Sequence, residues 1–136
     1  MSRYGTYGRA RKGEVVNFEE PNWEPLLNLI PEVSSDFMWM HEVKLRDGTR
    51  IHAYKHRTTR QYAHLTSDGA AWVYDSDADG YRRAELTWAV LAPLRPLFWD
   101  RERRQSRAER EYWLALHTLY LERFGDDSHE DEEDTY

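Results

Sequence analysis

Apolar and polar residues alternate through the middle of this chain, and Asp-Gly pairs interrupt the alternation at near-regular intervals. The pairs lie at 47–48, 68–69 and 79–80, and a polar cluster at 56–60 lies midway between the first two. Asp-Gly is a strong hairpin signal, because glycine adopts a positive φ without a steric penalty. Turns about every ten or eleven residues predict an antiparallel meander.

The segments between these turns predict five strands, at 37–45, 50–56, 60–66, 71–75 and 81–84. In the first of them the odd-numbered residues share one face, which we expect in the core. A bulged turn at 46–48 would place Val43 opposite Ile51, whereas a two-residue turn would place Val43 opposite His52. We favour the bulged turn because it buries Ile51. The face that carries the sheet histidines stays open; they are His41, His52, His56 and His64.

Helical segments are predicted before and directly after the meander. Asn22 can cap a short helix over 23–30, which Pro31 ends. Residues 85–91 predict a short buried helix, although a sixth strand would also fit. The apolar segment that follows contains a P-x-x-P unit at 93–96, and its large apolar neighbours favour a buried linker over an exposed polyproline ligand.

A long helix is expected near the end of the chain, from its cap Asp100 to Phe124, with Gly125 just past it. The predicted fold class is therefore α+β. It consists of a five-stranded antiparallel meander with a short N-terminal helix and a long C-terminal helix packed on one face.

Charge divides the chain into three parts, which carry +4 over residues 1–13, −3 over 14–125 and −7 over 126–136. Runs of one sign with few apolar residues repel themselves and stay solvated. We therefore expect a disordered basic tail at 1–13, a single α+β domain over 14–125 and a disordered acidic tail at 126–136. Six Trp and nine Tyr predict an aromatic core for that domain.

The chain has no cysteine, which excludes disulfides, cysteine-based zinc sites and thiol nucleophiles. No apolar signal segment opens the sequence, and no stretch is long enough to span a bilayer. We therefore expect a soluble, cytoplasmic protein with no membrane partner.

One acidic turn carries a partial metal motif. Residues 75–80 resemble the first half of an EF-hand loop, in which Asp75, Asp77 and Asp79 would converge on Ca²⁺. The resemblance ends there, because Leu86 stands where the loop needs a bidentate Glu. A solvated acidic turn is the favoured interpretation, with weak Ca²⁺ binding as the alternative and no other cofactor expected.

The sheet histidines could bind a metal, since neutral imidazole is a common ligand. No carboxylate accompanies them at a fixed spacing, so aromatic packing is the favoured interpretation. The sequence also shows no nucleophile motif, no P-loop and no G-x-G-x-x-G. We expect a protein without enzymatic activity.

The favoured function is a protein-interaction module that acts through the long helix and the exposed sheet face, with homodimerisation as part of that hypothesis. The partner-binding stripe of the helix would comprise Trp113, Leu116, Tyr120 and Phe124. A neighbouring apolar stripe comprises Ala108, Tyr112, Ala115 and Leu119.

The alternative function is nucleic-acid binding through the basic tail and an arginine face of the long helix. The residues concerned are Arg3, Arg9, Arg11, Lys12, Arg103, Arg104, Arg107 and Arg110. Interspersed acids, such as Glu111 four residues after Arg107, instead favour an ordinary salt-bridged helix surface.

Overall fold

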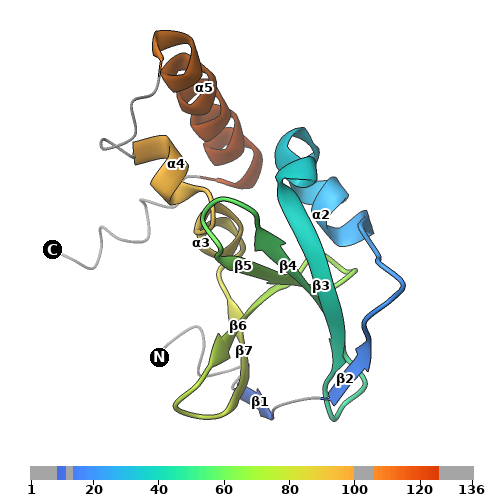
Figure 1. Cartoon of the computed structure of the whole chain (residues 1–136). Coiled ribbons are helices and arrows are strands. Elements are labelled where there is room, and N and C mark those ends of the chain that lie inside the picture. The colour runs from blue at the N-terminus through green and yellow to red at the C-terminus, as the bar shows by residue number, and fades with distance from the viewer. Residues whose placement is uncertain (1–8, 12–13, 100–105, 126–136) are drawn as a thin grey trace, which may run out of the picture.

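The computed structural model describes residues 9–11, 14–99 and 106–125 of the chain, which form an α+β domain (Figure 1). Its strands are β1 (Arg9–Arg11), β2 (Glu14–Asn17), β3 (Phe37–Lys44), β4 (Arg50–His56), β5 (Tyr62–Leu65), β6 (Ala71–Asp75) and β7 (Gly80–Ala84). Its helices are α2 (Glu24–Leu29), the 3₁₀ helix η1 (Pro31–Asp36), α3 (Leu86–Leu91), α4 (Arg95–Trp99) and α5 (Arg107–Phe124).

All seven strands form one antiparallel sheet in the order β1-β7-β6-β5-β4-β3-β2. Strands β2 to β7 therefore make a six-stranded meander, and β1 joins it beside β7. The predicted fold class is confirmed, but the meander has six strands instead of five. The added strand β2 has two adjacent valines in place of an alternating pattern, and β1 lies within the segment that we expected to be a disordered tail.

The turn between β3 and β4 is the bulged form that we favoured. Val43 lies opposite Ile51, the Leu45 amide donates to the Thr49 carbonyl at 2.8 Å, and Gly48 has a φ of 94°. A side chain at position 48 would be strained in this conformation, which explains why glycine stands there.

A β-bulge at Met40 interrupts β3, so the odd-numbered residues before it and those after it lie on opposite faces of the sheet. Trp39 lies opposite Tyr54, and His41 lies opposite Ala53. The prediction that every odd-numbered residue of this strand shares one face is therefore wrong, because the extra residue reverses the alternation. His52 and His56 lie on the face of Phe37, whereas His41 and His64 lie on the other face.

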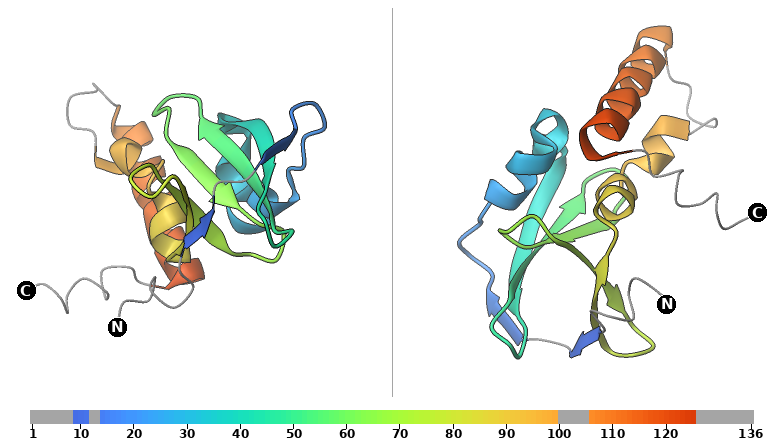
Figure 2. Two further views of the ribbon diagram at one scale, coloured as in Figure 1. Left: turned by 90° about the horizontal axis from the view of Figure 1, so that it is seen from below. Right: turned by 180° about the vertical axis from the view of Figure 1, so that it is seen from behind.

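The sheet curls until its two edge strands approach each other (Figures 1 and 2). Arg11 pairs with Gly80 at one edge, and Glu14 pairs with Lys44 at the other. Since Arg11 and Glu14 are three positions apart in the chain, their Cα atoms can be separated by no more than about 11 Å. The chain therefore keeps the end of β1 and the start of β2 close together.

The larger of two cores lies between the sheet and the helices. The sheet contributes Phe37, Tyr54 and Leu65, among others. The helices α2, η1, α3 and α5 contribute Leu26, Val33, Val90, Leu91, Trp113, Leu116 and Tyr120, among others, and Ile30 joins them from between α2 and η1.

The smaller core lies on the opposite face, inside the curl, and consists of Val43, Leu45, Ile51, Trp72 and Tyr81. These residues come from both sides of β5, and the curl brings them into contact. The sheet face that we predicted to be exposed to a partner is thus largely closed on itself.

The helix boundaries differ from the predicted ones at their starts. α2 begins at Glu24, one residue later than predicted, and Trp23 instead of Asn22 is its N-cap residue; the Asn22 side chain accepts a hydrogen bond from the Glu24 amide at 3.1 Å. The start of the long helix, predicted at Asp100, lies outside the described residues. Within them, α5 begins at Arg107, and the Ser106 side chain caps it by accepting from the Glu109 amide at 3.0 Å.

The predicted buried linker contains a helix of its own, α4. Gly125 follows α5 with a φ of 98°, as the C-terminal signal predicted. None of the described helices is long and apolar enough to cross a membrane.

Candidate functional site

The predicted partner-binding stripe of α5 packs into the domain's own core. Trp113, Leu116 and Tyr120 are buried there, and Phe124 is half-buried against the same core. The Tyr120 hydroxyl donates to Glu32 at 3.0 Å, and the Phe124 carbonyl accepts from Thr87 at 3.1 Å. An apolar stripe on a helix beside a sheet is used first to cover that sheet, so these residues are not an open partner surface.

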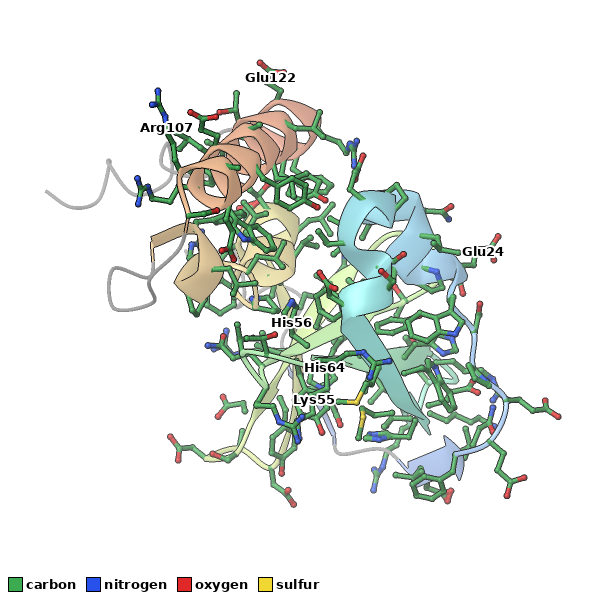
Figure 3. All side chains as sticks on the ribbon, turned by 45° about the horizontal axis from the view of Figure 1, so that its top comes forward. Glu24, Lys55, His56, His64, Arg107 and Glu122 are labelled. Atoms are coloured by element: carbon green, nitrogen blue, oxygen red, sulfur yellow. The ribbon has the colours of Figure 1, made fainter. Side chains whose placement is uncertain are left out.

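The opposite side of α5 is polar. Figure 3 shows Arg107 and Glu122 pointing away from the sheet, and Arg107 pairs with Glu111 at 3.1 Å. Tyr112 and Leu114 are the large apolar residues exposed on this helix. An exposed ion pair four residues apart is the salt-bridged helix surface that we weighed against a nucleic-acid site.

The other predicted nucleic-acid residues are placed only in part. Arg9 and Arg11 belong to β1, whose backbone pairs with β7. Arg110 is exposed on α5. Arg3, Lys12, Arg103 and Arg104 lie outside the described residues.

The most exposed apolar cluster belongs to the edge strand β2 and the residue that follows it. The side chains of Val15, Val16 and Phe18 are 46%, 40% and 68% exposed. On its outer side β2 has no neighbouring strand within the described residues. Proteins usually protect such edges with charges, prolines or a covering element, since an open apolar edge readily pairs with another chain. We call Val15, Val16 and Phe18 the β2 edge cluster.

The turn after β2 holds this cluster in place. The Asn17 side chain accepts from the amides of Glu19 and Glu20 at 2.9 and 3.0 Å and donates to the Glu20 carbonyl at 3.1 Å. The Phe18 ring lies 6.2 Å from that of His41, at the side of the sheet. These contacts fix the backbone around Phe18, so the exposed ring projects from an ordered turn.

The buried carboxylate of Glu42 accepts a hydrogen bond from Asn17 and so helps to hold the turn after β2. Glu42 accepts from Arg50 at 2.9 Å and from Asn17 at 3.5 Å. Burial opposes the ionisation of Glu42, but these hydrogen bonds outweigh it and lower the pKa of the carboxyl below its usual value. The charged form of Glu42 therefore supports the edge at neutral pH.

Exposed carboxylates flank the β2 edge cluster on both sides. Glu14 precedes it, and Glu19 and Glu20 follow it, all three exposed. The surface is thus apolar in the middle and acidic at its ends. This charge pattern was not recognised in the sequence, because nothing there marked 14–20 as a strand edge.

In the acidic turn at 75–80, the carboxylates of Asp75 and Asp79 interact within the hairpin, and Asp77 contributes its backbone amide. Asp75 accepts from the amides of Asp77 and Ala78 at 3.1 and 3.3 Å, and its second oxygen lies 3.7 Å from Arg82. Asp79 accepts from the Tyr74 hydroxyl at 2.6 Å. Among the described residues, no three or more histidines, aspartates or glutamates gather to hold a metal ion.

The four sheet histidines pack among aromatic and turn residues. His64 stacks on Tyr62 with ring centroids 5.5 Å apart, and His56 accepts from the amides of Thr58 and Thr59 at 3.1 and 3.3 Å. Burial lowers the pKa of all four below the usual value, and that of His64 to about 4. They are therefore neutral at pH 7.

Scans of this chain against known protein-family models, curated protein sequences and solved structures found no significant match.

Proposed function

We propose that this domain is a non-enzymatic protein-interaction module that binds an extended segment of a partner along β2. The observation that carries the proposal is the β2 edge cluster, on the edge strand and the residue directly after it, whose side chains are 40% to 68% exposed. An extended peptide can add a strand to such an edge: its backbone hydrogen-bonds to the edge, and pockets or patches for its side chains provide specificity.

The charges around β2 indicate what kind of segment fits. Glu14, Glu19 and Glu20 would repel an acidic peptide and attract one with lysine or arginine at its ends. A second copy of β2 would bring the same carboxylates together, so self-pairing is disfavoured. We therefore propose a partner segment with apolar residues in its middle and basic residues at its ends.

Phe18 is the expected anchor of the interaction. It is the most exposed large apolar residue of the described chain, and the hydrogen-bonded Asn17 turn holds its backbone. Aromatic anchors that are fixed before binding lose little conformational entropy when they are covered. Replacing Phe18 should therefore cost more affinity than replacing either valine.

The proposal is tested with two synthetic peptides of alternating valine and threonine, one with lysines and one with glutamates at its ends. Fluorescence anisotropy should show binding of the lysine peptide only, and the binding should weaken as salt is added. Phe18→Ser should reduce the affinity about tenfold or more. Leu114→Ser is the matched control, because Leu114 is 55% exposed on α5, away from β2.

Three results would contradict the proposal. One is equal binding of both peptides, and another is an equal loss of affinity in Phe18→Ser and Leu114→Ser. The third is a dimer in sedimentation that Phe18→Ser dissociates, which would make a second copy of the chain the occupant of β2.

A further inference from the structure

A pocket with a volume of about 420 Å³ lies where α2 and η1 meet the start of β3 and the turn after β4. This volume falls within the range of about 300 to 1,000 Å³ that small-molecule sites usually have. The lining combines large apolar side chains with two serines and one arginine; its residues are Trp23, Leu27, Phe37, Ser34, Ser35 and Arg57. No residue of the β2 edge cluster is among them, so the pocket is separate from the proposed peptide site.

The apolar part of the pocket pairs an exposed side chain with a fixed ring. Leu27 is 46% exposed although it belongs to a helix that packs on the core. Trp23 is half-buried, and its ring lies 5.7 Å from that of Tyr54, whose hydroxyl donates to the Asn22 carbonyl at 2.5 Å. These contacts hold Trp23 in place, so covering it with a ligand would cost little conformational entropy.

The polar part of the pocket is positively charged and has unused donors. Within the described part of the chain, the Arg57 guanidinium and the Ser35 hydroxyl make no hydrogen bond or ion pair. Arg60 donates to the Arg57 carbonyl at 3.4 Å, which brings a second positive charge to this turn. Among the described residues no carboxylate lines the pocket, since Glu24 and Asp36 neighbour lining residues in the sequence but do not belong to the lining. This part of the pocket therefore suits an anion.

We propose that this pocket binds a small free carboxylic acid with an apolar chain, of the short fatty-acid class. The carboxylate would pair with Arg57 and accept from Ser35, and the chain would cover Trp23 and Leu27. The charge selects this ligand, because a cationic chain would meet the like charge of Arg57 and a neutral chain would leave Arg57 unpaired. The volume favours a free acid over a carboxylate carried by a partner protein.

The test uses the Trp23 indole N–H as its reporter in ¹⁵N NMR spectra, with its resonance assigned from Trp23→Phe. Butanoate, hexanoate and octanoate are titrated below the concentrations at which they form micelles. We expect saturable shifts and an affinity that rises about threefold for each added CH₂ group, because each group moves from water to the apolar lining. Hexylamine and hexanol have the chain of hexanoate without its carboxylate, and each should bind about fivefold or more weakly than hexanoate.

Two variants and a matched control tie the shift to the pocket. Arg57→Gln should weaken hexanoate binding about fivefold and leave hexanol binding unchanged, because only the carboxylate needs the charge. Leu27→Ser should weaken the binding of both about threefold, since it removes apolar surface from the lining. Arg46→Gln should leave hexanoate binding unchanged, because Arg46 is an exposed turn residue that does not line the pocket. The other five indole resonances report that each variant is folded.

The proposal is overturned if hexanoate causes no saturable shift, or if hexylamine binds as tightly as hexanoate. It is also overturned if Arg57→Gln binds hexanoate as the unaltered chain does, or if Arg46→Gln weakens binding as much as Arg57→Gln. An acetylated tripeptide with a C-terminal leucine is the last probe. If it binds more tightly than octanoate, the occupant is the end of a partner protein instead of a free acid. None of these results depends on whether the β2 edge binds a peptide.

Discussion

The two cores lie on opposite faces of the same sheet, and they are closed in different ways. Among the described residues, the larger core comprises 16 buried residues and is covered by helices from three parts of the chain. The smaller core comprises five buried residues, all contributed by strands or their turns. Within the described residues no helix contributes to it, and the curl of the sheet shields it from water.

This difference shows which interactions each core depends on. The larger core is sealed by the amphipathic faces of α2, α3 and α5, and by the ion pair of Arg123 with Glu32 at 2.8 Å. The smaller core depends on the curl that brings together residues of β3, β4, β6 and β7 and of the turn after β3. We therefore expect the two cores to respond differently to cavities and to acid.

The largest expected difference concerns cavities. Leu65→Ala in the larger core should cost about 4 kcal/mol, because the surrounding helices and sheet cannot collapse into the space. Leu45→Ala in the smaller core should cost about 2 kcal/mol, since a curl without a covering layer relaxes more easily. Urea unfolding of both variants measures the two values. An equal or larger loss for Leu45→Ala would show that the smaller core is as rigid as the larger one.

The next difference concerns mild acid. Burial lowers the pKa of His64, which contacts Tyr81 at 5.6 Å, to about 4, while the unfolded chain takes up this proton near 6.5. The stability that the neutral, buried His64 allows is therefore complete above pH 6.5 and is lost as the pH falls toward 4, at a cost of about 3 kcal/mol. His64→Phe should reduce the acid sensitivity of unfolding in this window. NMR titration of the imidazole checks the cause, and a midpoint near 6.5 would refute it.

The smallest difference concerns stronger acid and the larger core. The hydrogen bond from Arg123 is the main cause that lowers the pKa of Glu32 to about 2. The stabilisation of the folded state by ionised Glu32 is complete above about pH 4.5 and is lost as the pH falls through 2. Because the pair is partly exposed, we expect about 1 kcal/mol. Glu32→Gln should weaken the dependence of the free energy of unfolding on pH below 4.5. An unchanged dependence in this variant would contradict the assignment.

Most of the meander could be predicted because its signals are local. The Asp-Gly turns set the strand ends, and the burial of Ile51 selected the correct register of β3 and β4. The bulge at Met40 could not be predicted, because the alternation of β3 continues unbroken through it in the sequence. The strand β1 is only three residues long, too short for any periodicity to appear.

The candidate site was harder to predict than the fold, because exposure depends on which element covers which. The stripe at Trp113 and Leu116 has the composition of a partner surface, yet it is buried in the core against the sheet. Val15 and Val16 have the composition of a core strand, yet they lie at an open edge. The pocket beside Arg57 depends on how α2 and η1 pack against the sheet, which no single segment of the sequence reveals.

The position of β1 has a consequence for the order in which the chain assembles. Strands β2 to β6 each pair with the next strand along the chain, but Arg9 of β1 pairs with Arg82 of β7, 73 positions later. Contacts between distant residues form slowly, because the intervening loop must be closed first. During synthesis on the ribosome, β1 must therefore wait for β7 before it can pair, and until β7 emerges Tyr81 is missing from the smaller core.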